Sequence, residues 1–423
     1  MSNIHKTTHQ IWTEGIKTLL PFITIIILLV GCSGKKTTPV STTTKTESSQ
    51  VETEQPWYDG EKPFIFDEKE NYPETKIKLS DLAEVSYIPL KMNDSTILKV
   101  KSSWRGNDFF VTSDRIYLQE IHRELYIFKK DGTFLNKINR EGEGPEDYIN
   151  IGNYIVDTLY KEIFIQDWVR RRTQVYDLEG NFKRTFLNFA FEIVELNDSL
   201  LLNFFQHFQS TPNGSEYSVT QGPQYSVTRK KDGSTVFDLP IHFNVKLPDE
   251  AFSMLAYGSL IKTPQGVFLS NLQNDTIFEI KRDLSISPRI IDISDYGTTF
   301  AQAHPTIETK RYLMFNILRS YRYKPEIKQR FYIYDKKEKQ IYKMTDFSDK
   351  IYWALLDNYP QIQNWDTTQS PYIAVRPRQV RDLFMAGDEH GDDKLKEIIK
   401  HLNEKDNPVL QVMTFHDVEQ VLK

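Results

Sequence analysis

Five segments of the chain repeat one pattern, which is an apolar strand, a polar turn and a second strand. The segments occupy residues 124–139, 173–187, 224–240, 276–291 and 330–345. Their turns recur about every 50 residues and centre on Asp131-Gly132, Glu179-Gly180, Asp232-Gly233, Arg282-Asp283 and Lys337-Glu338. Because glycine accepts a positive φ, Asp-Gly between two apolar runs predicts a β-hairpin. The last two turns lack this glycine and give a weaker hairpin signal.

Further strand-like runs precede each hairpin, so each repeat contains more than two strands. These runs lie at residues 114–122, 161–168, 199–206, 266–273 and 312–319, and innermost strands are expected at 154–157 and 192–196. Four strands per repeat at this period are typical of β-propeller blades. The predicted fold class is therefore all-β, a six-bladed β-propeller of four-stranded antiparallel blades.

The sixth blade is expected to combine strands from both ends of the chain. The candidates are the runs Thr75–Leu90 and Pro408–Phe415. Their pairing would close the ring and leave no free sheet edge. Residues of about 378–404 read as helix, break and helix, with Leu395, Ile398, Ile399 and Leu402 on one face. We expect a small helical insertion there, near the C-terminus.

The first residues carry the marks of export. Lys6 and Lys17 supply a positive region before an apolar run over residues 18–30, which has the length of a signal-peptide core. The run ends in Leu29-Val30-Gly31-Cys32, which predicts a lipoprotein signal peptide over 1–31 and lipidation of Cys32. A Ser/Thr/Lys/Glu-rich stretch over 32–56 predicts a flexible tether, and the propeller is expected over 57–423. Cys32 is the only cysteine, so an internal disulfide is excluded.

Charge and motif content exclude several classes of function. The formal net charge of −5 gives no basic surface for nucleic acid. The chain contains no HExxH, no paired-histidine metal spacing and no G-x-S-x-G elbow. The sequence therefore predicts no catalytic residue, no metal ligand and no cofactor. His207 and His304 are expected in loops and are the least unfavourable candidates for an enzyme.

Four stretches resemble the six-bladed β-propeller lipoproteins of Bacteroidota, which are related to NHL-repeat propellers. They are the lipobox, the strand YIPL at 87–90, the loop REGEGPEDY at 140–148 and the ending LNEKDNPVL at 402–410. The resemblance covers roughly residues 75–415. The resemblance implies a protein of the cell envelope that a lipid anchors to the outer membrane. The members of this family mostly lack an assigned function. Glu146-Asp147 depart from the family loop, which carries more glycine there.

The loop at 139–148 is the first candidate site. Arg140, Glu141, Glu143 and Tyr148 would line a pocket for a glycan, a peptide or a cation at the mouth of the channel. In the alternative, which the sequence favours, the glycines and the proline of this loop shape a turn between two blades.

The run from Asp167 to Arg172 is the second candidate site. Trp168 follows a strand and is flanked by Asp167, Arg170 and Arg171, which is a pattern suited to a carbohydrate or an anion. The alternative is an exposed basic turn with Trp168 packed between blades. Other aromatic stretches, at 204–208, 217–225, 321–324 and 352–365, are expected mainly at blade interfaces.

Two functions remain open from the sequence. The first is a non-catalytic binding or scaffold lipoprotein, held to the membrane by lipid, for a glycan, a peptide or an envelope protein. The second is a propeller enzyme, such as a lactonase, a lyase or a glycan-active hydrolase. The enzyme needs His207, His304, Asp167 and Glu141 to converge in one cavity.

Overall fold

The computed structural model describes residues within 62–415, apart from internal gaps, the longest of which are 99–108, 249–259, 320–329, 348–372 and 381–392. The predicted signal peptide, Cys32, the tether and His207 lie outside the described residues. The chain separates into two units, residues 1–53 and residues 54–423, and only the second contains described residues. No helix in its described part is long and apolar enough to span a membrane.

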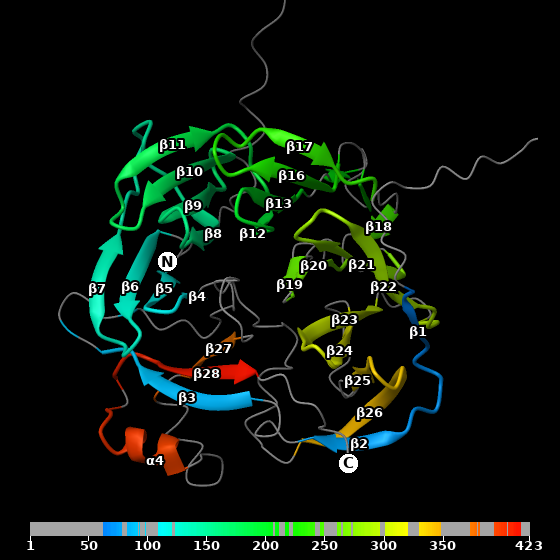
Figure 1. The fold of residues 1–423 in the computed structure, drawn as a ribbon. Coiled ribbons are helices and arrows are strands. Elements are labelled where there is room, and N and C mark those ends of the chain that lie inside the picture. Colours follow the sequence, from blue (N-terminus) through cyan, green and yellow to red (C-terminus); the bar gives the residue numbers. More distant parts are fainter. Residues whose placement is uncertain are drawn as a thin grey trace, which may run out of the picture. The chain divides into compact units, whose positions relative to one another are not determined.

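Six sheets follow one another around a ring as the blades of a β-propeller (Figure 1). Each of the first three blades has four antiparallel strands. Blade one contains β4 (Phe109–Val111), β5 (Arg115–Glu120), β6 (Glu124–Lys129) and β7 (Phe134–Ile138). Blade two contains β8 (Ile151–Asp157), β9 (Glu162–Asp167), β10 (Arg172–Asp177) and β11 (Phe182–Phe186). Blade three contains β12 (Glu192–Glu195), β13 (Leu200–Phe204), β16 (Tyr225–Arg229) and β17 (Thr235–Asp238).

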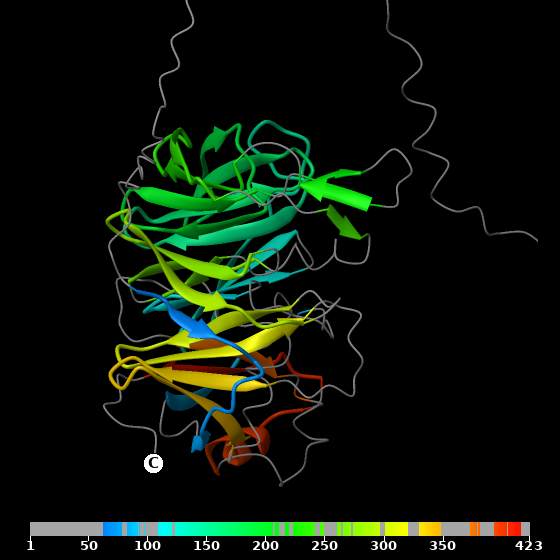
Figure 2. The ribbon, with the colours of Figure 1, turned by 90° about the vertical axis from the view of Figure 1, so that its right-hand side faces the viewer.

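The next two blades each gain a fifth strand from the N-terminal part of the described chain. Blade four contains β19 (Leu260–Lys262), β20 (Gly266–Leu269), β21 (Thr276–Lys281), β22 (Ile286–Asp292) and β1 (Phe64–Phe66). Blade five contains β23 (Ala301–Glu308), β24 (Tyr312–Arg319), β25 (Phe331–Asp335), β26 (Gln340–Phe347) and β2 (Glu74–Ile77). Strands β1 and β2 pair in parallel with β22 and β26 at the outer edges of these sheets (Figure 2).

The predicted hairpins are the third and fourth strands of blades one to five, counted from the innermost strand, and β1 and β2 pair outside them in blades four and five. Together with the closing blade, these five sheets confirm the six-bladed prediction. Gly132, Gly180 and Gly233 adopt φ values of 79°, 90° and 72° in the first three turns. In blades four and five the residues with positive φ are Leu284 (76°) and Lys339 (55°). The turn geometry is therefore kept where the glycine is lost, at the cost of placing a side chain in the left-handed region.

Blade six joins the two ends of the propeller. Its described strands are β27 (Ile373–Arg378), β28 (Val409–Phe415) and β3 (Ala83–Pro89), with β28 in the middle. Strand β28 pairs antiparallel with β3 from Val409↔Pro89 to Phe415↔Ala83, which confirms the predicted closure. Only the second part of the candidate run Thr75–Leu90 lies in this blade, because β3 belongs to blade six and β2 to blade five.

Helix α4 (Asp393–Ile399) lies between β27 and β28 in the chain, which confirms a helical insertion in the last blade. Leu395 is buried with Tyr87 and Val409, and the other predicted apolar residues of the helical face pack against the same cluster. Strand β27 extends to Arg378, so the insertion begins after that residue. A separate small sheet contains β14 (Phe208–Ser210), β15 (Glu216–Val219) and β18 (Lys246–Pro248).

We predict that a charge in the closing strand opens the ring. Met413 in β28 is 0% exposed. Met413→Asp should therefore lower the free energy of unfolding by about 4 kcal/mol or more, because a carboxylate buried there loses its hydration. The same change at Leu135, which is 40% exposed on β7, should cost about 1 kcal/mol or less. Urea unfolding of both variants measures the difference, and equal losses would contradict a closure that depends on β28.

Candidate functional site

Both candidate sites lie at one end of blade two. Ile151, which starts β8, pairs with Asp167, which ends β9, and Asp167 pairs with Arg172, which starts β10. The end of β11 reaches the same place, because Phe186 pairs with Thr173. Three connections therefore meet here, and we call them together the loop end of blade two. They are the β7–β8 loop (139–150), the β9–β10 turn (168–171) and the β11–β12 linker (187–191).

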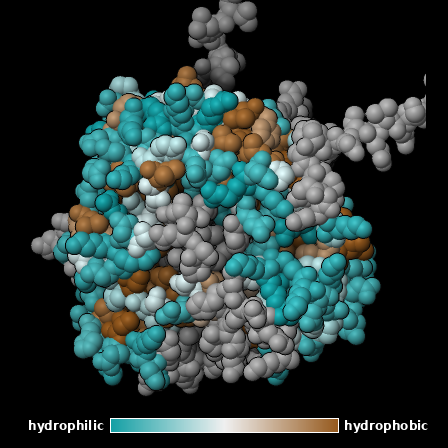
Figure 3. All heavy atoms as spheres, in the orientation of Figure 1, coloured by the Kyte–Doolittle hydropathy of each residue, from teal (hydrophilic) through white to brown (hydrophobic). Residues whose placement is uncertain are grey.

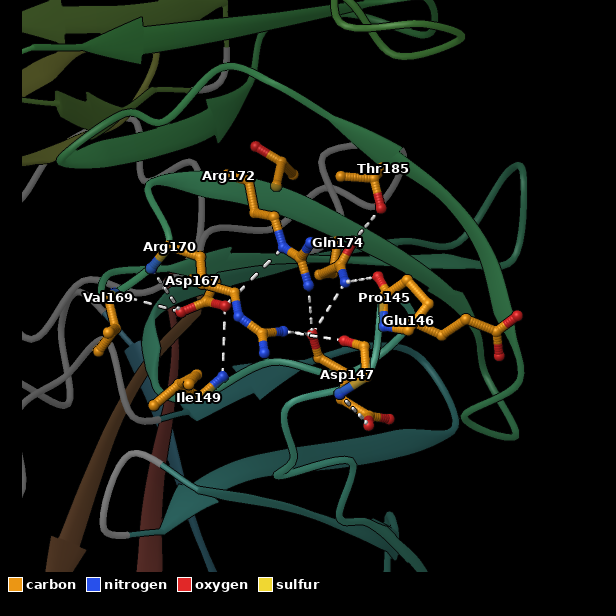
Figure 4. A network of polar contacts seen from close by, with 12 residues as sticks. Pro145, Glu146, Asp147, Ile149, Asp167, Val169, Arg170, Arg172, Gln174 and Thr185 are labelled. Atoms are coloured by element: carbon orange, nitrogen blue, oxygen red, sulfur yellow. Dashed lines mark hydrogen bonds and ion pairs between the residues drawn. The ribbon is translucent and has the colours of Figure 1, made fainter.

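Side chains in and before β10 bind the backbone carbonyls of the β7–β8 loop (Figure 4). Arg170 Nη1 donates to Gly144 O at 2.9 Å and to Asp147 O at 3.0 Å. Arg172 Nη2 donates to Asp147 O at 2.7 Å.

Two further residues of β10 complete this set of contacts. Gln174 Nε2 donates to Pro145 O and Asp147 O, both at 3.0 Å, and the Tyr176 hydroxyl donates to Glu146 O at 2.7 Å. Residues 172, 174 and 176 share one face of the strand because side chains alternate along β10. Four consecutive carbonyls of the loop are thus satisfied by the next blade, and we call this contact the carbonyl clamp.

The glycines of the loop make room for Asp147. Its Oδ2 accepts a hydrogen bond from Gly144 N at 3.1 Å. A Cβ on either Gly142 or Gly144 would lie 2.6 Å from the same oxygen. A side chain at either position would therefore displace the carboxylate that holds the turn.

The predicted ligand residues of this loop have structural partners. Tyr148 is fully buried, donates to Arg123 O at 2.7 Å, and burial raises its pKa to about 12. Glu141 forms an ion pair with Arg123 at 2.8 Å, and Arg140 lies 3.9 Å from Glu146. Glu143 is exposed. These contacts agree with the alternative of a turn between blades, while ligand binding by these residues stays a prediction.

Asp167 forms the β9–β10 turn. Its side chain is 0% exposed and accepts hydrogen bonds from the backbone of Val169 (3.2 Å), Arg170 (3.3 Å) and Ile149 (3.2 Å). Arg172 Nε lies 4.0 Å from the same carboxylate. The carboxylate is thus surrounded by donors from two connections and holds them together.

Trp168, Val169 and Arg171 are the exposed residues of that turn. Trp168 is 48% exposed, and its indole lies so close to Gly152 that a Cβ there would be 2.5 Å from Cδ1. The Trp168 and Phe191 ring centroids are 5.2 Å apart. The Arg171 guanidinium lies 5.3 Å from the centroid of Phe189, which is its only partner among the described residues.

The β11–β12 linker supplies the aromatic residues that the sequence reasoning missed. Asn188 and Ala190 fix its backbone, because Asn188 O accepts from Thr173 Oγ1 (3.0 Å) and Ala190 N donates to Gln166 Oε1 (3.0 Å). The intervening Phe189 and Phe191 contact the turn instead. The alternation of apolar and small or polar residues in Leu-Asn-Phe-Ala-Phe at 187–191 was the signal available for it.

Among the residues that the structure describes, eight large hydrophobic side chains are exposed, and three of the eight lie here. On the face in Figure 3, hydrophobic residues form separate patches among hydrophilic ones. Trp168, Val169 (59%) and Leu187 (93%) all belong to the loop end of blade two. We call Trp168, Arg171, Phe189 and Phe191 the aromatic platform.

His304 lies in β23, so the expectation of a loop is wrong. It is 1% exposed, and its Nδ1 lies 2.9 Å from Ser270 Oγ. Ser270 in turn donates to Gln302 Oε1 at 3.0 Å, which leaves Ser270 Oγ to accept from a protonated Nδ1. The Nε2 atom of His304 is buried, and it has no hydrogen-bond partner among the described residues. Burial lowers the pKa of His304 to about 4.

The residues proposed for an enzyme have partners in different blades. Glu141 pairs with Arg123 of blade one, Asp167 holds connections of blade two, and His304 contacts Ser270 beside blade four. In the described part of the chain, no group of three or more His, Cys, Asp or Glu side chains is arranged to hold a metal ion.

The model of one protein family, "Domain of unknown function (DUF4934)", matches residues 63–414. The chain belongs to this family. The DUF4934 match spans the described propeller and both sites above. No curated protein matches the chain.

Two of the solved structures similar to this DUF4934 propeller come from Bacteroides. A "Putative exported protein" from Bacteroides fragilis has 18% sequence identity and a TM-score of 0.57, over 84% of this chain and 100% of that chain. A DUF4221 family member from Bacteroides vulgatus has 9% identity and a TM-score of 0.43, over 80% of this chain and 99% of that chain. The first likeness supports the fold.

Neighbouring arginines of the DUF4934 propeller should differ in their effect on stability. Arg170→Ala removes donors from two carbonyls of the carbonyl clamp, so we expect a loss of about 1–3 kcal/mol in the free energy of unfolding. Arg171→Ala removes only the contact with Phe189 and should cost about 1 kcal/mol or less. Chemical unfolding measures both, and the reverse order would disprove the assignment of the clamp.

His304 should make the stability of the DUF4934 propeller depend on pH between its folded pKa of about 4 and its ordinary value of 6.5. In this window the unfolded chain binds a proton that the folded chain excludes. The free energy of unfolding should therefore fall as the pH is lowered through the window, by up to about 3 kcal/mol from this group.

The matched control for that experiment is the exposed His401, which follows α4. His304→Gln should remove this part of the pH dependence, and His401→Gln should leave it in place. Urea unfolding at a series of pH values measures the slope. A slope that survives in His304→Gln would show that other groups cause it.

Proposed function

We propose that this DUF4934 chain is a lipid-anchored protein of the cell envelope that acts as a non-catalytic binding module for a glycan, a peptide or a protein partner. The observation that carries the proposal is the aromatic platform. Among the residues that the structure describes, the exposed Trp168 ring, the half-buried Phe189 and Phe191 rings and an arginine without a carboxylate partner share a backbone that internal hydrogen bonds hold in place. Such preformed surfaces bind at a low cost in conformational entropy.

The charges of the neighbouring loop support binding in preference to a reaction. Asp167 accepts three backbone hydrogen bonds, Glu141 pairs with Arg123, and Arg170 donates to carbonyls. A general acid or base must reach the proton that it transfers, and these groups already have partners within the protein.

The membrane attachment rests on the sequence Leu29-Val30-Gly31-Cys32 and on the apolar run before it. A relative in fold from Bacteroides fragilis bears the description of an exported protein, which is consistent with a place outside the cytoplasm. Acylation at Cys32 with more than one chain would give stable anchoring, and residues 32–56 would act as the tether. We place the protein at the outer membrane, on its periplasmic or its surface face.

Both parts of the proposal can be tested with the full-length protein. We expect wild type in the membrane fraction with a covalent lipid on the Cys32 peptide by mass spectrometry, and Cys32→Ala in the soluble fraction. Detergent-purified wild type should bind a member of a glycan and peptide panel, and Trp168→Ala should bind it at least about tenfold more weakly. Release of the protein from the membrane while its lipid remains attached would refute the lipid anchor. A panel in which no member binds would refute the binding function.

A further inference from the structure

We infer that the aromatic platform binds a saccharide that carries a carboxylate, with the sugar ring on Trp168 and the carboxylate on Arg171. The inference rests on the proposed binding function and names its ligand class. Three features carry it, namely the fixed backbone of the platform, its charge and the exposed ring of Trp168.

The platform is rigid because hydrogen bonds to neighbouring strands fix the backbone of the β9–β10 turn and of the β11–β12 linker. In the β9–β10 turn, the Asp167 carboxylate binds the amides of Val169 and Arg170. In the linker, Ala190 N donates to Gln166 Oε1, and Phe191 N donates to Phe204 O at 2.8 Å. The aromatic side chains are therefore held at set positions before a ligand arrives.

Among the described residues, Arg171 is the one arginine of this turn that has no carboxylate or carbonyl partner. Three consecutive arginines occupy this stretch, but Arg170 and Arg172 donate to the carbonyls of residues 144 and 147. Arg171, at φ 54°, projects from the turn and contacts only the ring of Phe189 among the described residues. Its guanidinium fork keeps its donors for a ligand and matches a carboxylate in a bidentate way.

The rings favour a flat amphipathic ligand. One side of the Trp168 indole lies against the backbone of Gly152, and Phe191 contacts it at 5.2 Å between centroids. With the indole 48% exposed, its open side offers an apolar surface. A sugar ring can cover such a surface with its C–H groups and keep its hydroxyls in water, so it loses little hydration.

Other anionic ligands fit less well. Phosphorylated peptides are usually bound by a cluster of arginines that matches a charge near −2, whereas Arg171 is the one arginine of the platform, and Phe189 is its only partner among the described residues. Peptides that add a strand need an open sheet edge, whereas the platform consists of a turn and a linker. A carboxylate has a charge of −1, which a single guanidinium neutralises.

The test uses full-length wild type in mild detergent with two probes, a hexamer of galacturonate and a hexamer of galactose, measured by calorimetry. We expect the acidic hexamer to bind more tightly than the neutral one, and to weaken as salt rises. Arg171→Ala should weaken only the acidic hexamer, by about tenfold or more. Arg171→Lys should recover part of this affinity, and Trp168→Ala should weaken both probes.

The chain offers a matched control in the β8–β9 turn at the opposite end of blade two. Tyr160 is 51% exposed there, and Lys161 has φ 53°, which is close to that of Arg171. Tyr160→Ala and Lys161→Ala should leave both affinities unchanged. Equal losses in these controls would mean nonspecific attraction by a cation and would overturn the inference.

Two further results would also overturn it while leaving the proposed function intact. The first is a failure of the acidic hexamer to bind when a member of the broader panel binds in a way that Trp168→Ala abolishes. The second is equal affinity for the acidic and the neutral hexamer. If no member of the panel binds, the proposed function itself is refuted. The failure of the inference and the failure of the proposed function are therefore distinguishable.

Discussion

The antiparallel pairing of β28 with β3 is the constraint on which the propeller depends, because it joins the two ends of the ring. Leu410 and Val412 of β28 share a buried cluster with Phe109 and Leu118 of blade one, so the closing blade also covers its neighbour. Gly132 links this closure to the repeat. A Cβ there would lie 2.0 Å from Pro89 O, so the glycine of the first hairpin serves both its own turn and the approach of β3.

The carbonyl clamp applies the same logic between adjacent blades. A linker that leaves one sheet and enters the next has carbonyls that no strand can satisfy. Here Gly144 to Asp147 are satisfied by residues 23 to 30 positions later in the chain. Charged residues in this loop therefore serve the fold first. The loop is recognisable in the sequence because its glycines and its partners in β10 restrict what can replace it.

The sequence predicted the features that local chemistry controls and missed those that depend on distant partners. The Asp-Gly turns predict the hairpins, and the 3.6-residue spacing of apolar residues predicts which face of α4 is buried. Nothing between Thr75 and Ile88 breaks the run, since neither glycine nor proline occurs there, so its division between two blades was hidden. Pro305 directed His304 to a loop, yet β23 accommodates the proline at a register shift between Pro305 and Ile307. The partner of Trp168 in the β11–β12 linker could not be foreseen either, because it lies about 20 residues later in the chain and its contact depends on how the blade folds.

The two turns of blade two show why geometry alone does not make a binding site. Lys161 and Arg171 have nearly equal positive φ values, so that backbone belongs to the turn and says nothing of a ligand. Their surroundings differ. Tyr160 lies beneath Lys230, which also bridges the buried Asp157 and the partly buried Glu195. That end of the blade is therefore occupied by internal charge pairs. At the other end the internal contacts use Arg170 and Arg172, while Arg171 lies over the half-buried Phe189 ring, in the same turn as the exposed Trp168. A ligand-binding role is therefore better supported by which donors remain after the fold is satisfied than by how many charges a stretch contains.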